Sequence, residues 1–561
     1  MPSSFLRRHV RGLLRGKFSP SPTFDGDDPP TPLDDQGAFL SQCHLAGIDG
    51  RRIEFPEVYF GKTGLDIPCI QLECFNTDVF ASYTGPDGGL TQVGEMRRQP
   101  LVRMANLDDE MNLSMDGTSE YDESDEDDDG DQPIPAPLRR DKDKNRYLVA
   151  MCFILTLKSQ CLGQTLTSLY NWELFDEERA FGASVSLYEK NPLTGVNAGE
   201  PVADVWGVIG RSNNGVLALA DGVNWGDGAR LAARCAVRGA IDHMNEHIEK
   251  GNLKSTTEVF HELLASFHSA HSLILQEGGM LTTLCVGVVA PAVNCDRYTH
   301  WVLCVCNVGD SLCFVYNQNY GVREVTMGSH DIDQMRDMRD AGGALGPVDG
   351  RNPQLHNLTC SMTFVEEGDI VFITSDGVSD NFDPVVGKFC VIKRAKVENK
   401  ENSQLPLPDN RKLSVATKDS PPREFARTRT CAATLPCVDA ASRHELMLVR
   451  MRDIIACRFS STRDSLFPRV TASVLSHRLI QFATHLSQAK RRTLENPDLY
   501  RKEKMTRSEQ RSRRRAVREK IADMPGKLDH ASVVAYTVGR HGLRGLPSTI
   551  FFHSSHFFFE I

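Results

Sequence analysis

The sequence lacks the cysteine spacings of a zinc ribbon or a compact disulfide framework. Its 16 Cys are scattered, no C-x-x-C motif occurs, and only Cys304 and Cys306 lie close together. Such usage favours a reducing compartment, so we expect an intracellular protein, cytoplasmic or nuclear. Residues 1–24 carry five basic residues and no acid, which leaves a mitochondrial transit peptide as the alternative to a disordered basic arm.

Long hydrophobic runs are missing as well. The longest, Tyr147–Leu157, is far shorter than the roughly 20 residues of a membrane helix, so no transmembrane segment is expected.

Basic residues are absent from residues 107–132, although this stretch holds thirteen acidic residues. It cannot bury enough apolar surface to offset the entropy of ordering, which predicts an acidic disordered linker over residues 107–145. The net charge of −10 comes from this segment, and the rest of the chain is nearly neutral. The linker offers a surface for protein partners. The most basic stretch, Tyr500–Lys520, has no aromatic residues interleaved with its bases; it predicts a solvated helix, and nucleic acid is not an expected partner.

From about residue 173 the chain contains short apolar runs that end in turn residues. Most are four to seven residues long and rich in Val, Ile and Cys, which is typical of strands. Stretches with apolar residues three and four apart lie between them and predict helices. This order indicates an α+β fold with packed antiparallel sheets flanked by helices. The predicted strands are Val205–Ile209, Val216–Ala220, Leu284–Ala290, Trp301–Cys306, Cys313–Tyr316, Ile370–Thr374 and Val533–Val538; the predicted helices are Gly228–Glu249, Thr256–Gln276, Asp331–Ala341 and Val470–Leu494.

These signals divide the chain into four parts. Residues 1–106 show no convincing core pattern and stay unassigned, and the acidic linker follows. One domain spans residues 173–545, interrupted by a polar insertion at 391–465 that offers a second surface for protein partners. Residues 546–561 form an apolar tail.

Three aspartates sit at the ends of predicted strands. Asp221 and Asp376 follow strands, whereas Asp529 precedes one. If the last strand runs antiparallel to the others, all three carboxylates project from the same rim of the sheets. The sequence then predicts an oxygen-rich site.

Mg²⁺ or Mn²⁺ is the cation that such a rim would hold, because both prefer carboxylates, carbonyls and water over His or Cys. Gly222 and Gly377 follow two of the aspartates; lacking a Cβ, they let the backbone turn sharply and bring a carbonyl near an ion. Any single Asp-Gly pair is also a common turn, so the inference depends on their joint placement.

Four motifs occur in the order seen in the metal-dependent protein phosphatases of the protein phosphatase 2C type, and the chain resembles that family over roughly residues 181–384 and 466–539. Ala341–Gly343 falls where the family has a similar element. The motifs are Ala220–Ala232, Asn307–Ser311, Thr374–Asn381 and Leu528–Val534.

The resemblance implies two packed antiparallel sheets with two metal ions at one edge, where a water activated by the ions attacks the phosphorus of phosphoserine or phosphothreonine in a phosphoprotein substrate. By position, Asp221 would bridge both ions and Gly222 would offer its carbonyl. Asp376 and Asp529 would complete one ion's shell. Asp310 would be structural.

The chain departs from the family at several positions. Val223 and Trp225 stand where the family has His and Gly, so the imidazole proposed as a general acid is missing. Upstream, the phosphate-binding Arg has no clear counterpart apart from Arg179, and Lys190 follows Glu189 where the family has Glu-Asp.

The outer shell of the site is altered too. The family's Asp-His pair appears as Ser329-His330, with Asp331 as the substitute acid, and His530 replaces the Asn after the last Asp. Candidate outer-shell residues are Glu189, His330, Asp331, Asp380 and His530.

Two functional hypotheses follow. The first is a Mg²⁺- or Mn²⁺-dependent protein serine/threonine phosphatase. The alternative is a weak or inactive pseudophosphatase that keeps the fold as a binding scaffold, because the ligands for two ions remain while the phosphate clamp and the acid are missing or displaced.

Overall fold

The computed structural model describes residues 55–96, 172–293, 300–326, 341–392, 435–438, 440–456, 469–497 and 506–542. The predictions of a basic N-terminal arm, an acidic linker, a helix at Asp331–Ala341 and an apolar tail concern residues outside these ranges, apart from Ala341 itself.

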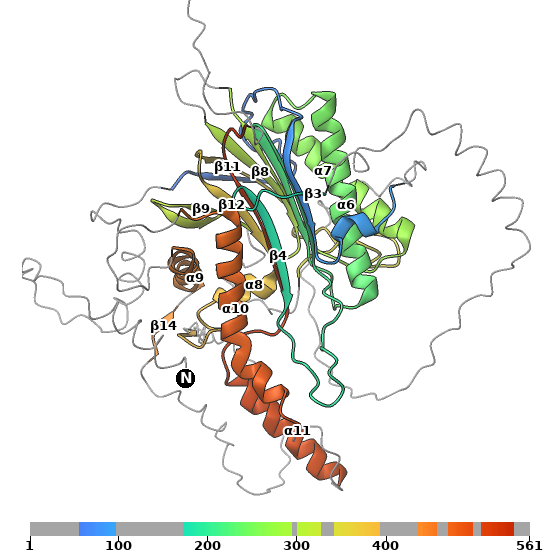
Figure 1. Ribbon diagram of the computed structural model, residues 1–561, viewed down its shortest axis with the longest axis vertical. Coiled ribbons are helices and arrows are strands. Elements are labelled where there is room, and N and C mark those ends of the chain that lie inside the picture. Colours follow the sequence, from blue (N-terminus) through green and yellow to red (C-terminus); the bar gives the residue numbers. More distant parts are fainter. Residues whose placement is uncertain are drawn as a thin grey trace, which may run out of the picture.

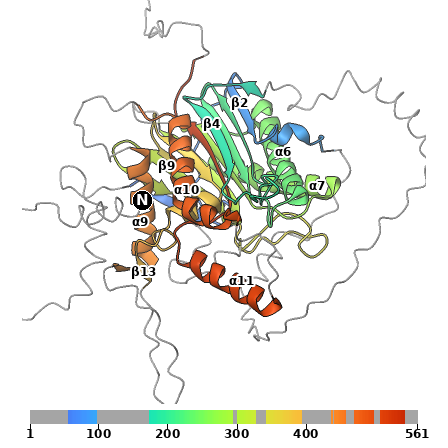
Figure 2. The ribbon, with the colours of Figure 1, turned by 60° about the horizontal axis from the view of Figure 1, so that its bottom comes forward.

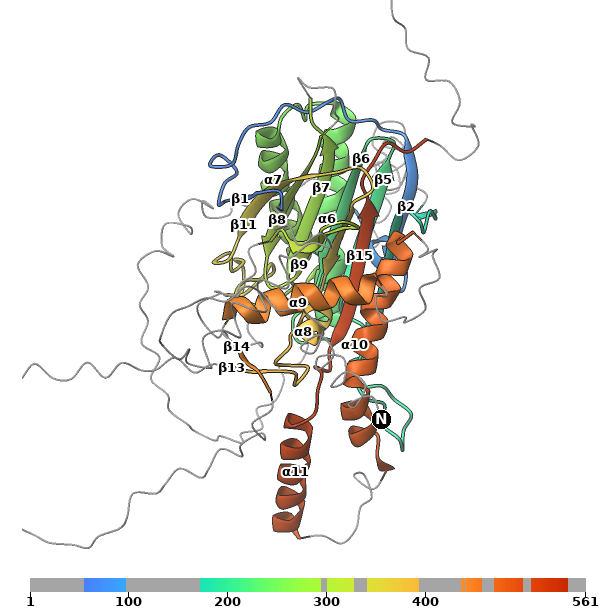
Figure 3. The same cartoon turned by 90° about the vertical axis from the view of Figure 1, so that its left-hand side faces the viewer.

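Two antiparallel sheets pack face to face, and helices cover their outer faces (Figures 1 and 3). This confirms the predicted α+β sandwich. The eight-stranded sheet has the order β1 (Val58–Gly61), β11 (Thr359–Val365), β8 (Trp301–Val308), β7 (Leu284–Pro291), β6 (Asn214–Ala220), β5 (Val205–Arg211), β2 (Val79–Gly85) and β3 (Glu173–Leu174). The five-stranded sheet has the order β10 (Gly321–Glu324), β9 (Leu312–Asn317), β12 (Ile370–Thr374), β15 (His530–Thr537) and β4 (Ala180–Ser186).

The central strands are apolar on both faces because each face is covered. Between the sheets lies a core that includes Trp206, Leu217 and Tyr536. Every residue of β5, β6, β7 and β8 is buried, which explains why these strands appear in the sequence as continuous apolar runs rather than as alternating patterns.

Helices α6 (Asp227–Lys250) and α7 (Thr256–Glu277) cover the eight-stranded sheet (Figure 1). Small residues bring the two helices close together: a Cβ on Gly239 would lie 2.8 Å from the Cα of Ala270. Both helices begin and end within one residue of the predicted bounds, since the spacing of apolar residues at three and four is long and regular.

The five-stranded sheet is covered by α8 (Asp376–Phe382), α9 (Ala440–Ile455) and α10 (Ala472–Leu494). Helix α11 (Arg507–Ala522) extends away from the sandwich (Figures 2 and 3), as expected for a helix that is polar on every face. A 3-10 helix, Gly89–Gln92, and the short parallel pair β13 (Val391–Ile392) and β14 (Cys437–Val438) complete the described elements. None of the described helices is both long and apolar enough to cross a membrane.

Two parts of the domain division need correction. Strands β1 and β2 come from the region left unassigned, pairing with β11 and β5, so the sandwich begins well before residue 173. Within the predicted polar insertion, α9 buries Met447, Leu448 and Met451 in the core against the five-stranded sheet. These three elements pack against partners that lie far away in the sequence, so the local pattern did not assign them to the sandwich.

Candidate metal centre

Asp376 and Asp529 lie at the same end of the five-stranded sheet. Strands β12 and β15 are antiparallel, and Thr374 at the end of β12 pairs with Val533. Asp376 comes just after β12 and Asp529 just before β15, so the antiparallel arrangement expected from the sequence is confirmed.

Asp221 joins them from the other sheet. It directly follows β6, and its backbone is fixed on both sides: its N–H donates to Thr283 Oγ1 at 3.0 Å, and its carbonyl accepts from Thr283 N at 2.8 Å. Burial raises the pKa of Asp221 well above its usual value, and the neighbouring carboxylates of Asp376 and Asp529 raise that pKa further. The three aspartates that the sequence singled out therefore form one electrostatic cluster.

A fourth carboxylate, Asp204, lies beside Asp221. It precedes β5, and Val205 pairs with Ala220, the residue before Asp221. Asp204 is fully buried, and burial raises its pKa. Of the neighbours of Asp221, Asp204 is the carboxylate that raises its pKa most.

The carboxylate oxygens of Asp204 lack hydrogen-bond partners of ordinary geometry among the described residues. The hydroxyls of Ser375 and Ser532 lie close enough to oppose the upward shift of the Asp204 pKa, although Ser375 Oγ also donates to His530 O at 3.3 Å and Ser532 Oγ lies 2.7 Å from Ser184 Oγ. In the described part of the chain, Asp376 Oδ1 is likewise buried without a partner. Buried carboxylate oxygens in this state require a proton or a cation, so the donor set fits a hard divalent ion.

Lys527 connects three of the carboxylates. Its Nζ contacts Asp376 Oδ2, lies 2.8 Å from Asp380 Oδ2 and lies 3.1 Å from Asp529 Oδ2. Burial alone would lower the pKa of Lys527, but the three carboxylates outweigh it and raise that pKa. One ammonium thus neutralises only part of the negative charge of the cluster, which also includes Asp204 and Asp221.

His530, predicted as an outer-shell residue, is buried, and both nitrogens of its ring form hydrogen bonds with backbone atoms. Its Nδ1 accepts from Ala203 N at 3.3 Å, and its Nε2 lies against the Gly199 carbonyl. These partners assign the proton to Nε2. Because Ala203 precedes Asp204, His530 holds the segment that delivers the fourth carboxylate.

Two aromatic side chains border the cluster. The Tyr188 hydroxyl donates to Asp529 Oδ1 at 3.1 Å, and burial followed by the Asp529 charge raises the pKa of Tyr188. Trp225, 51% exposed, lies with its ring 6.0 Å from that of Tyr188. Asn224 and Trp225 adopt φ values of 69° and 52°, a left-handed conformation that costs non-glycine residues energy.

Both Asp-Gly pairs need a glycine, because other backbone atoms lie where a Cβ atom would be. A Cβ on Gly377 would overlap the carbonyl oxygen of His530, and a Cβ on Gly222 would lie 2.8 Å from backbone atoms of Ala229. The Gly222 carbonyl, predicted as a ligand, accepts a long hydrogen bond of 3.4 Å from Trp225 N.

The other predicted residues have different outcomes. Asp380 contacts Lys527 inside the cluster. Asp310 lies in the turn between β8 and β9, and its charge raises the pKa of Asp221. Glu189 stays a prediction: its carbonyl accepts from Ala198 N, while its neighbour Tyr188 makes the contact with Asp529. His330 and Asp331 lie outside the described residues.

Arg179 cannot serve as a phosphate clamp. It precedes β4, where Ala180 pairs with Tyr536, whereas the cluster lies at the other end, near the pair Ser186 and His530. Six residues of extended strand separate the two ends, a distance of about 20 Å. Its guanidinium instead pairs with Asp176 at 3.6 Å.

Asp204, Lys527 and Tyr188 were not found by sequence reasoning. The Asn213-Asn214 turn between two apolar strands indicates a hairpin, and pairing outward from it places Asp204 opposite Asp221. This signal could have identified Asp204. Lys527 and Tyr188 lie in loops, where no periodic pattern indicates the direction of a side chain.

Comparison with known proteins gives concordant results. A family model described as protein phosphatase 2C matches residues 195–405. A curated relative from Drosophila melanogaster, PP2C-like domain-containing protein CG9801, is 33% identical over an alignment that covers 90% of this chain and 91% of the relative.

Solved structures resemble the chain more weakly. A phosphatase from Toxoplasma gondii is 10% identical, covers 65% of this chain and 95% of its own, and has a TM-score of 0.32. The phosphatase domain of the cell fate determinant SpoIIE from Bacillus subtilis is 10% identical, covers 67% and 100%, and has a TM-score of 0.27. At such scores these structures add nothing to the residue assignments.

Proposed function

We propose that this chain, which belongs to the protein phosphatase 2C family, hydrolyses phosphoserine and phosphothreonine in proteins with the help of Mg²⁺ or Mn²⁺. The observation that carries the proposal is the convergence of Asp204, Asp221, Asp376 and Asp529 on one rim. Among the described residues, both carboxylate oxygens of Asp204 and Oδ1 of Asp376 are buried there without a hydrogen-bond partner of ordinary geometry.

The cations would be held by Asp221, Asp376 and Asp529, with the Gly222 carbonyl as a further ligand. Asp204, beside Asp221, adds the negative charge that a second divalent ion requires. When bound, the ions would polarise a phosphoryl oxygen and lower the pKa of a water molecule.

Two aromatic side chains, Tyr188 and Trp225, would orient a metal-binding carboxylate and the substrate. Tyr188 donates to Asp529 Oδ1 and fixes the direction of that carboxylate. Its raised pKa makes it a positioning residue that keeps its proton, not an acid for the leaving group. The exposed ring of Trp225 and the half-buried ring of Tyr188 form an aromatic edge against which the polypeptide of a phosphoprotein substrate would pack.

The test uses the full-length chain and a phosphopeptide. Mn²⁺ should be required for hydrolysis, EDTA should abolish it, and Asp376→Asn should reduce it at least about 100-fold, the usual cost of removing a group that stabilises the transition state. Asp78→Asn, at an exposed carboxylate just before β2, is the matched control and should leave the rate unchanged. Equal rates for Asp376→Asn and the control would refute the proposal.

A second function, a binding scaffold without turnover, is favoured by Lys527. Its ammonium already contacts three of the carboxylates, and Arg179 lies at the far end of β4. Under this hypothesis no metal concentration yields hydrolysis, while Asp376→Asn leaves the binding of protein partners intact. The acidic segment at 107–145 and the 391–465 region are the proposed surfaces for such partners.

The proposed compartment is the cytoplasm or nucleus. Cys285, Cys304, Cys306, Cys313 and Cys360 are free and buried in the sandwich, and free thiols persist in a reducing environment. Fluorescence microscopy of the tagged chain tests this assignment, and a mitochondrial or secreted signal would contradict it.

A further inference from the structure

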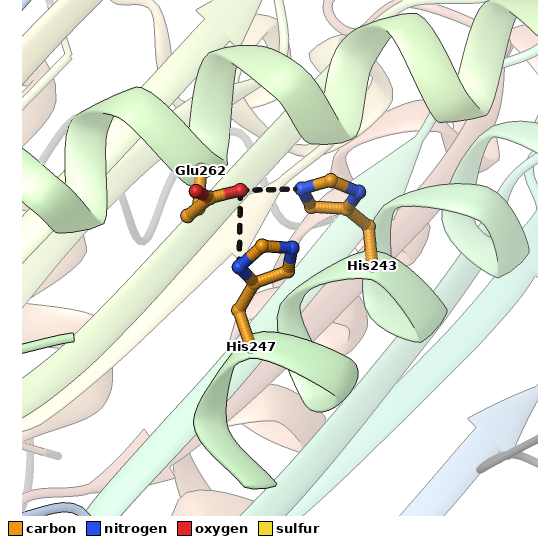
Figure 4. Close-up of side chains that lie close together, drawn as sticks. All are labelled: His243, His247 and Glu262. Carbon is orange, nitrogen blue, oxygen red and sulfur yellow. Dashed lines mark hydrogen bonds and ion pairs between the residues drawn. The ribbon is translucent and has the colours of Figure 1, made fainter. Parts of the chain in front are cut away.

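Three metal-ligating side chains meet on the helical face of the eight-stranded sheet, away from the aspartate cluster. His243 and His247 lie in the last two turns of α6, and Glu262 lies in the second turn of α7 (Figure 4). His243 comes sixteen residues after the start of α6, which begins near the aspartate rim, so about 24 Å of helix separates it from that end.

One carboxylate oxygen faces both imidazoles. Glu262 Oε2 lies 2.9 Å from His243 Nε2 and 3.3 Å from His247 Nδ1. The two histidines are four residues apart on one face of α6, and their rings stack with centroids 4.6 Å apart. Each residue offers a ligand atom within 4.8 Å of the other two.

These separations are close to those of a tetrahedral zinc site. Zn–N and Zn–O bonds of about 2.0–2.2 Å give ligand atoms about 3.4 Å apart. The two N···O separations at Glu262, 2.9 and 3.3 Å, would therefore change by no more than about 0.5 Å when an ion enters. Two histidines spaced i,i+4 on a helix are a recurrent zinc-binding arrangement.

The contacts of Glu262 with the two imidazoles are ones that an ion would replace. His243 Nε2 and Glu262 Oε2, 2.9 Å apart, share a hydrogen bond in the metal-free chain, and a zinc ion would take the place of the proton between them. The other ring nitrogen, His243 Nδ1, lies 3.2 Å from Ser269 Oγ, the kind of partner that orients a metal-binding imidazole. His247 Nδ1 lies 3.1 Å from the amide nitrogen of Asn252 and 3.3 Å from Glu262 Oε2, so an ion bound there would displace the exposed Asn252 side chain.

The unprotonated form of the His243 imidazole is also favoured. Burial lowers the pKa of His243, and a metal-binding imidazole must be unprotonated. The side chains of His243, His247 and Glu262 are 18%, 17% and 13% exposed, which is enough for an ion to reach them from solvent. His261 Nδ1 lies 3.1 Å from Glu262 Oε1, the oxygen that faces away from the pair.

We propose that His243, His247 and Glu262 form a zinc site that joins α6 to α7 and leaves the fourth coordination position to water. Hard Mg²⁺ prefers oxygen ligands and octahedral geometry, so this site and the aspartate rim would select different ions. The inference does not depend on phosphatase activity.

The experiment is a calorimetric titration of the metal-free, full-length chain with Zn²⁺ in excess Mg²⁺. The wild type should bind zinc at this site, and His243→Gln and His247→Gln should each weaken that binding at least about 100-fold, since even the loss of groups that only support ligands costs 10–100-fold. His485→Gln, exposed on α10, is the matched control and should bind as the wild type does. Co²⁺ in place of zinc should give visible bands of tetrahedral coordination that both variants lose.

Zinc-free thermal melts of the variants establish that they fold, and Glu262→Gln provides a third variant from the other helix. Asp376→Asn should retain this zinc site in full, which separates the inference from the phosphatase proposal. Equal zinc affinity in the wild type and His247→Gln, or loss of zinc binding in Asp376→Asn alone, would overturn it.

Discussion

Asp204 and Asp221 lie side by side at the open end of the β5–β6 hairpin, one before its first strand and one after its last. Asp204 is fully buried. Of the carboxylates near Asp221, Asp204 raises the pKa of Asp221 most. Two acids held this close destabilise the metal-free chain and create a strong attraction for cations.

The first prediction concerns this pair. Asp204→Asn should raise the thermal midpoint of the metal-free protein, by roughly 2–4 °C per kcal/mol of repulsion removed. The same substitution should weaken Mn²⁺ binding, because a buried negative charge is lost. Calorimetry measures both effects, and Asp78→Asn should change neither. A variant less stable than the wild type without metal would contradict the repulsion argument.

Stability should fall as pH rises in the absence of metal. The pKa values of Asp204, Asp221, Asp376 and Asp380 are all raised, chiefly by burial, so the folded state binds protons that the unfolded state, with carboxyl pKa values of about 4, releases. Their contribution is complete below about pH 4 and is lost as pH rises through the folded pKa values.

Urea unfolding at several pH values, compared between wild type and Asp221→Asn, isolates this contribution from that of other groups. The difference should shrink when Mn²⁺ is present, since the ion takes the place of the protons. An identical pH dependence for both proteins would show that Asp221 does not titrate within the cluster.

Lys527→Gln should act on folding and on metal binding in opposite directions. Removing the ammonium leaves Asp376, Asp380 and Asp529 unpaired, so the metal-free chain should lose stability, by up to about 3 kcal/mol since the site is partly exposed. Mn²⁺ should bind more tightly, because it no longer competes with a resident cation. Lys520→Gln, exposed on α11, is the control. Weaker Mn²⁺ binding by Lys527→Gln would mean that Lys527 assists the ions.

Trp225→Gly should relieve a left-handed backbone conformation at φ 52° and stabilise the chain by about 1 kcal/mol. The exposed ring would be lost from the aromatic edge, so KM for a phosphopeptide should rise while hydrolysis of a small aryl phosphate stays unchanged. Steady-state kinetics with both substrates is the measurement. Equal effects on the two would place Trp225 at the phosphoryl group itself.

Gly377→Ala should destabilise the fold by about 3 kcal/mol or more, because the added Cβ overlaps the His530 carbonyl. Gly287→Ala is the matched control: its Cβ would have its nearest neighbour at 3.5 Å, an ordinary contact. Denaturant midpoints of the two variants should therefore differ strongly. Similar midpoints would show that β15 can withdraw from the Asp376 turn.

The sequence alone determined the central strands, α6, α7 and α10, and the three aspartates 221, 376 and 529, because continuous apolar runs, helical periodicity and strand-end positions are local features. Only the tertiary structure decided the rest. Strands β1 and β2 and helix α9 are stabilised by partners far away in the sequence, and Arg179 is excluded from the site by the length of β4. Lys527 and Tyr188 reach the carboxylates from loops, and Glu262 meets two histidines across a helix pair. In each case the contact depends on where distant segments pack, which no local pattern encodes.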